Sequence, residues 1–300
     1  MSSSLLKSVF LLFLMIIATV AIPPKANAAS SMGFVELPVV GFAGSAYTRC
    51  NETGEYGLQA SKAPTELENN RCAVTSPKLL ESPMNAPLEG FNMVGMISRG
   101  VPIPAPYAAD AGEEFATLTD TIWRNKDTKE CIFGTHILMK EPKLANGQQW
   151  EINDIARGGF AGRPVAVAYF FKPEPIKEYG LPEVLFRVGR TFTSVHLGKG
   201  TIDLPTIKDE PAHKVAISSN QAAAISENWV NFTTDINYAD PDGITRKMTP
   251  MLYIKTTCEA EQPVEKEGAI RLRTTGQNGQ KLLEIDVPGL VPVGASVEVK

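Results

Sequence analysis

The sequence predicts an all-β protein: an antiparallel β-sandwich of the jelly-roll kind, with a loop-rich N-terminal region and a C-terminal β-hairpin appendix. Three observations support this prediction. Apolar and polar residues alternate with a period of two through much of residues 109–258, turn residues recur at short intervals, and helical periodicity is scarce. The 22 prolines and 24 glycines follow no G-X-Y repeat, which excludes a collagen-like chain.

Residues 1–28 are predicted to be a cleavable signal peptide. Lys7 supplies a positive charge, an apolar run extends from Val9 to Ile22, and Ala26-Asn27-Ala28 offers small residues for cleavage. The run is too short for a membrane anchor, because 14 helical residues span roughly 21 Å of a hydrocarbon core of roughly 30 Å. We therefore expect a secreted or periplasmic mature chain without a membrane span.

The four cysteines are predicted to form two disulfides, since their number is even and the chain is expected to be exported. We expect Cys50 to pair with Cys72 in the loop-rich region, and Cys131 with Cys258 around the strand-rich block. The two other pairings stay open at this point. Zinc is disfavoured because no spacing matches C-x₂₋₄-C.

Residues 29–108 form the loop-rich region. Six prolines between Pro77 and Pro106 prevent a mostly helical structure. At most two short strands are expected there, around Gly33–Val40 and Phe91–Ser98.

Residues 109–258 are expected to form the sandwich. Pro164–Phe171 is apolar at every position after its proline, which predicts a central strand covered on both faces. A two-turn helix is the best interpretation of Ser218–Ser226. Further strands are predicted at Cys131–Met139, Val184–Val188, Thr191–Leu197 and His213–Ile217.

Val230–Tyr238 alternates strictly and predicts a half-buried strand. Asp240-Pro241-Asp242-Gly243 follows as a turn, and Met251–Cys258 as the next strand. We expect these two strands to pair with each other in antiparallel fashion.

Residues 259–268 are polar and charged and are interpreted as a linker. Residues 269–300 resume the alternation around Asn278-Gly279, a preferred hairpin turn. A hairpin of this size is marginal alone, so it should pack on the sandwich or on another molecule.

Charge and motifs exclude several function classes. Removing the signal peptide leaves 27 basic and 33 acidic residues, a net charge of −6, which argues against nucleic-acid binding. The chain has no G-x-S-x-G and no H-E-x-x-H motif, and its three histidines are isolated. No catalytic residues are therefore predicted, and the protein is expected to lack catalysis of its own.

Two groups of residues are candidate binding sites. Trp229 and Trp150 could stack on a sugar, and Arg163 after a glycine-rich turn could bind an anion, although a packed tryptophan and a plain turn are the simpler interpretations. Asp235, Asn237, Asp240 and Asp242 carry oxygen ligands of the kind that calcium takes. A strand end followed by a tight turn explains the same four residues.

These observations favour an exported binding or structural protein of the cell surface or extracellular space, with a protein or glycan as its partner. The alternative is a carbohydrate-binding or carbohydrate-active β-sandwich. The C-terminal hairpin is the expected place for pairing with a partner strand.

Overall fold

The structure is a computed structural model of the chain. It describes residues 33–42, 46–51, 65, 70–105, 107–108, 110–141, 144–147, 149–172, 183–192, 225–239, 246–259, 262–273 and 284–298. All of them belong to the second of two compact units, Ser31–Lys300. The predicted signal peptide, residues 1–28, lies outside the described residues.

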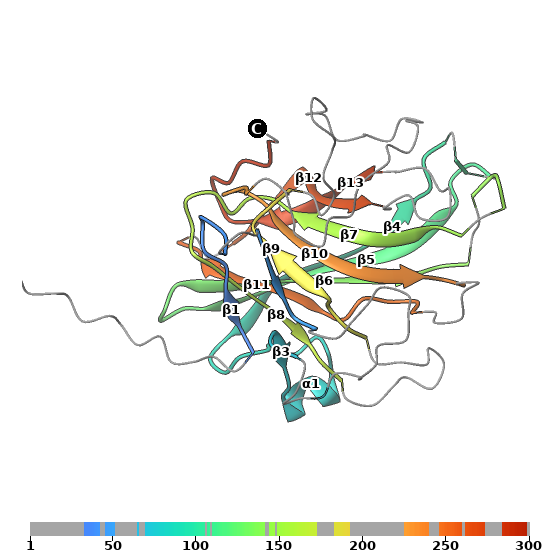
Figure 1. The fold of residues 1–300 in the computed structure, drawn as a ribbon. Helices are drawn as coiled ribbons and strands as arrows, with labels where there is room; N and C mark the ends of the chain where they lie inside the picture. Colours follow the sequence, from blue (N-terminus) through green and yellow to red (C-terminus); the bar gives the residue numbers. More distant parts are fainter. Residues whose placement is uncertain are drawn as a thin grey trace, which may run out of the picture. The chain divides into compact units, whose positions relative to one another are not determined.

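Two β-sheets form the body of this unit (Figure 1). The seven-stranded sheet has the order β1 (Val35–Glu36), β8 (Val165–Phe170), β11 (Leu252–Thr257), β6 (Glu130–Met139), β5 (Glu114–Asn125), β4 (Asn92–Pro102), and β3 (Ala73–Val74) also pairs with β8. The six-stranded sheet has the order β13 (Glu284–Val291), β12 (Val264–Arg273), β7 (Glu151–Arg157), β10 (Val230–Asn237), β9 (Arg187–Gly189), β2 (Tyr47–Arg49). The strand pairs are antiparallel except β3 with β8, and helix α1 (Pro77–Glu81) has five residues.

The two sheets share one apolar core, and the predicted all-β sandwich is confirmed. Ile122 and Phe133 of the seven-stranded sheet belong to the same buried cluster as Ile155, Phe232 and Leu272 of the six-stranded sheet. Alternation places one side of each strand in this cluster. The jelly-roll order of connections stays a prediction.

Strand β8 is buried along its whole length. Val167 and Tyr169 belong to the main core, whereas Ala168 and Phe170 belong to a second apolar cluster. Because successive side chains point to opposite faces, the second cluster covers the other side of the sheet. The prediction of a central strand covered on both faces is confirmed.

The predicted pairing of Val230–Tyr238 with Met251–Cys258 is wrong. Both ranges form strands, β10 and β11, but β10 pairs with β7 and β9, whereas β11 pairs with β6 and β8. The two strands therefore lie in different sheets. Alternation shows which face of a strand is apolar, but it does not identify the neighbouring strand.

The N-terminal region contains more strands than expected. Four strands, β1 to β4, lie within residues 29–108, where at most two were predicted. β2 and β3 were not predicted, because strands of two or three residues are too short to show a period of two. The second predicted strand, Phe91–Ser98, is the start of the longer β4.

The C-terminal hairpin is part of the sandwich and not an appendix to it. β12 pairs with β13 as expected, but it also pairs with β7, for example Leu272 with Ile155. β12 begins at Val264, inside the stretch interpreted as a linker. The predicted turn at Asn278-Gly279 lies outside the described residues.

Other predicted strands have mixed outcomes. Cys131–Met139 is confirmed as β6, and Val184–Val188 is replaced by the shorter β9. Of Thr191–Leu197, the structure describes two residues, and Thr191 bridges to Ile225. The predicted strand His213–Ile217 and most of the predicted helix Ser218–Ser226 lie outside the described residues.

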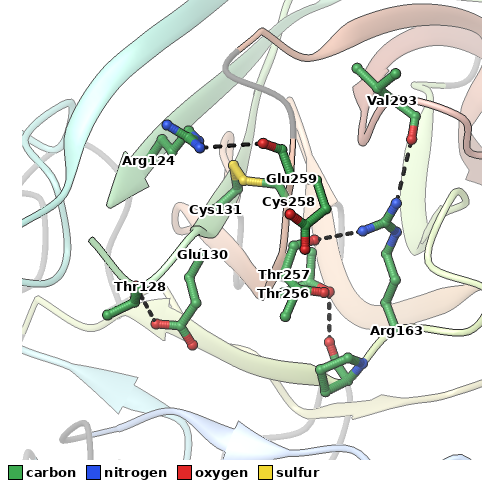
Figure 2. The surroundings of a disulfide bond; sticks show 11 residues. Arg124, Thr128, Glu130, Cys131, Arg163, Thr256, Thr257, Cys258, Glu259 and Val293 are labelled. Atoms are coloured by element: carbon green, nitrogen blue, oxygen red, sulfur yellow. Dashed lines mark hydrogen bonds between the residues drawn. A yellow bond between two sulfur atoms is a disulfide. The ribbon is translucent and has the colours of Figure 1, made fainter. Parts of the chain in front are cut away.

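Both predicted disulfides are confirmed, with Cα–Cα separations of 5.1 Å for Cys50–Cys72 and 5.7 Å for Cys131–Cys258. Cys50 follows β2 and Cys72 precedes β3, so this bond joins the two sheets. Cys131 in β6 and Cys258 after β11 lie on neighbouring strands of one sheet (Figure 2).

Candidate functional site

The candidate site is the outer edge of β4, the last strand of the seven-stranded sheet. Ten residue pairs join β4 to β5, from Asn92 with Arg124 to Pro102 with Glu114. Within the described part of the chain, no strand pairs with the other side of β4. An unpaired edge presents a row of backbone N–H and C=O groups to any extended chain.

This edge is accessible over most of its length. Every residue from Asn92 to Gly100 is exposed or partly exposed. The exposed fraction of the residue is large for two apolar residues of the strand, 45% for Met93 and 53% for Met96. Exposed methionines beside unpaired backbone groups are adaptable contact surface for a partner.

Contacts with the second sheet hold the strand in place. Arg99 forms an ion pair with Glu265 of β12. Gly95 lies against Pro263 and Leu290, where an added Cβ would be 3.6 Å and 3.7 Å from the nearest atoms. The inner side of β4 is thus anchored while its edge stays open.

The other long edge strand, β13, is protected at Leu290. The Leu290 N–H donates to Asp120 Oδ2 at 2.6 Å, and Arg157 Nη2 donates to the Leu290 carbonyl oxygen at 2.7 Å. Pro288 in the same strand has no N–H to offer. The structure therefore does not favour the predicted use of the hairpin for partner pairing.

Asp120 and Arg157 form an ion pair through the core, from β5 in one sheet to β7 in the other. The bond from Arg157 Nη1 to Asp120 Oδ1 is 2.7 Å long, and both side chains are fully buried. Burial raises the pKa of Asp120, and the neighbouring guanidinium opposes that rise. The pair was not predicted from the sequence, although Asp120 and Arg157 stand at inward positions of the apolar alternation in β5 and β7 and could have been recognised by it.

A second buried polar row crosses the outer face of the six-stranded sheet. The Tyr47 hydroxyl donates to Asn231 Oδ1 at 3.1 Å, Asn231 donates to Asp154, and Arg273 donates to both Asp154 and Glu284. Burial disfavours the charged guanidinium of Arg273, but the two carboxylates outweigh it and raise its pKa. The carboxylates are matched by donors, so the row stabilises the alignment of strands.

The two candidate sugar-binding tryptophans are both packed inside the protein. Trp229 lies on the outer face of its sheet, as alternation requires, but it is 1% exposed and its ring meets Phe192 edge-on at 4.7 Å. Trp150 is equally buried and stacks on Phe115 at 4.6 Å. Neither indole offers an exposed stacking surface.

Arg163 forms bonds within the chain. Its Nη1 donates to the Thr257 carbonyl oxygen at 2.8 Å, and its Nη2 lies 3.4 Å from the Val293 carbonyl oxygen. Figure 2 shows the side chain extended between these two carbonyls beside the Cys131–Cys258 disulfide. The side chain thus ties the chain beyond β13 to the end of β11, and the alternative of anion binding by Arg163 stays a prediction.

The calcium candidates are only partly described. Asp235 Oδ1 accepts a hydrogen bond from Asn153 at 3.4 Å, and Asn237 Oδ1 accepts one from the Ala239 N–H at 3.2 Å. Asp240 and Asp242 lie outside the described residues. Among the described residues no group of three or more His, Cys, Asp or Glu side chains could hold a metal, and calcium binding stays a prediction.

No family model matches the chain, and no curated protein or solved structure matches it. None of the helices in the described ranges is long and apolar enough to cross a membrane.

Proposed function

We propose that the chain is an exported, non-catalytic protein that binds a partner strand at the cell surface or in the extracellular space. The observation that carries this proposal is the 11-residue edge strand β4, which has exposed methionines and no strand on its outer side in the described residues. The partner adds a strand to the sheet, so backbone hydrogen bonds supply affinity and the side chains around Met93 and Met96 supply selectivity.

Two disulfides support the assignment to an oxidising compartment. All four cysteines are at most 4% exposed and are paired, as is typical of structural disulfides in exported proteins. The N-terminal apolar run and the small residues before Ala29 support the same assignment. Sequencing of the mature N-terminus should then begin at Ala29.

Carbohydrate binding is the alternative. All three tryptophans, Trp123, Trp150 and Trp229, are 1% exposed, so a sugar site would need other groups than an indole platform. A glycan array with the mature wild-type chain tests it, and a specific signal would favour this alternative over strand addition.

Site-specific photo-cross-linking tests the proposed function. A photoreactive amino acid replaces Met96 in the exported protein, and a matched control replaces Leu80 on α1, which is 57% exposed and away from the edge. We expect a discrete adduct from position 96 alone, identified by mass spectrometry. Equal or absent labelling at the two positions would overturn the proposal.

A further inference from the structure

We infer that the partner strand is β4 of a second copy of this chain, paired antiparallel about a twofold axis so that two seven-stranded sheets become one. This inference rests on the proposed function and names its partner. The evidence is the backbone geometry, the charge and the accessibility of β4.

The backbone of β4 suits pairing with itself. Register shifts against β5 occur between Met93 and Gly95 and between Val101 and Pro102, so Gly95–Val101 is a regular stretch between two irregular ends. An antiparallel twofold pair brings the same stretch against itself and satisfies both open edges at once. The result is a closed dimer, in which neither copy of β4 remains an edge strand.

Charge also favours a second copy. Arg99 is the only ionisable residue in β4, and it is already paired with Glu265 of its own chain. A second β4 therefore introduces no unpaired like charge, whereas like charges directly opposite destabilise a strand pair. Edge strands that stay unpaired commonly carry lysine or an interior proline, and β4 has no lysine and has its proline at its last position.

The side chains around the edge leave room for the added strand. Met96 and Ser98 are exposed on the outer face, and Ser98 Oγ lies 3.2 Å from Thr119 Oγ1 of β5. Short polar and flexible apolar side chains can contact their symmetry equivalents without moving the core. The other edges are less suited, because β1 and β3 have two residues each and β2 has three.

Sedimentation velocity on the purified chain of residues 29–300 tests the inference. We expect a dimer for wild type and a monomer for Met96→Lys at the same concentration, because a lysine on an exposed edge strand opposes pairing with another strand. Leu80→Lys is the control and should stay dimeric. The far-ultraviolet circular dichroism spectrum of Met96→Lys should match that of wild type, because Met96 is already 53% exposed and the substitution leaves the core unchanged.

Disulfide cross-linking provides an independent measurement. The native cysteines are all paired, so Ser98→Cys adds one free thiol per chain. Mild oxidation should convert Ser98→Cys, but not the control Leu80→Cys, to a covalent dimer on a non-reducing gel. Equal rates of cross-linking for the two variants, or a dimer unchanged by Met96→Lys, would overturn the inference.

The two proposals fail in different ways. If the purified chain is monomeric and position 96 labels a different protein, strand binding at β4 stands and the second copy is wrong. If position 96 labels nothing, binding through β4 is itself wrong.

Discussion

At the residue scale, Gly134 makes room for a tryptophan in the second apolar cluster. A Cβ at this position would lie 2.6 Å from Trp123 Cζ3, closer than real contacts allow. Gly134→Ala should therefore lower the free energy of unfolding by about 1–3 kcal/mol, measured by urea denaturation. Gly95→Ala is the control, because its Cβ would meet ordinary contacts of 3.6 Å and 3.7 Å and should change stability little.

The buried ion pair makes a second residue-scale prediction. Asp120→Asn leaves Arg157 charged in the core without a counterion, which should cost about 3–5 kcal/mol of stability. Glu114→Gln is the matched control: it breaks a solvent-exposed pair with Lys140 and should cost less than about 1 kcal/mol. Equal losses in chemical denaturation would show that the core pair has no special role.

His136 predicts a pH dependence. Burial lowers its pKa from 6.5 to about 4. The unfolded chain therefore binds a proton at this site more readily than the folded chain does, and the stability contributed by neutral His136 is lost as pH falls from 6.5 towards 4.

The variant His136→Gln isolates this effect. As the pH is lowered from 6.5 to 4, the melting temperature of wild type should fall by more than that of the variant. A temperature difference that does not change over this interval would contradict the lowered pKa.

At the element scale, the C-terminal hairpin should be essential for folding. Deletion of residues 262–300 removes β12 and β13, two strands of the six-stranded sheet, together with the Leu290 contacts to Asp120 and Arg157. We expect loss of the cooperative thermal transition measured by circular dichroism. A chain ending at Glu298 is the control, and a cooperative transition in both would show that the hairpin is dispensable.

The elements also show what strand patterns can predict. Long alternating or apolar ranges, such as those of β6, β8 and β10, were recognised because burial of one or both faces leaves a periodic trace in the sequence. The edge position of β4 and the true neighbours of β10 could not be predicted from such patterns. Strands pair through backbone groups, which are common to all residues and therefore do not appear in the sequence. The site at β4 could therefore not be located from sequence.

At the scale of the whole molecule, the two disulfides should stabilise unequally. On a chain-entropy basis, closing the 127-residue separation of Cys131–Cys258 contributes about 5 kcal/mol, and the 22-residue separation of Cys50–Cys72 about 3 kcal/mol. Paired Cys→Ser variants, compared by denaturant unfolding, should show this order.

The Cys50–Cys72 bond has a further role because it joins the two sheets. Hydrogen exchange should therefore increase at β2 and β3 in its Ser variant more than in the other. A larger loss of stability in the Cys50–Cys72 variant, together with equal hydrogen exchange at β2 and β3 in the two variants, would contradict these roles of the two bonds.

The sequence by itself determined the sheet-rich class and the main strands, and it favoured the two cysteine pairings that the structure confirms. The class and the strands follow from side-chain periodicity, whereas the even count of four cysteines left three pairings open. Only the tertiary structure decided that β10 and β11 lie in different sheets, that the hairpin completes the sandwich and that Trp229 is covered. Each of these depends on which distant segments meet. That choice is made by the whole fold, which buries apolar area and satisfies buried polar groups together, and no local pattern specifies it.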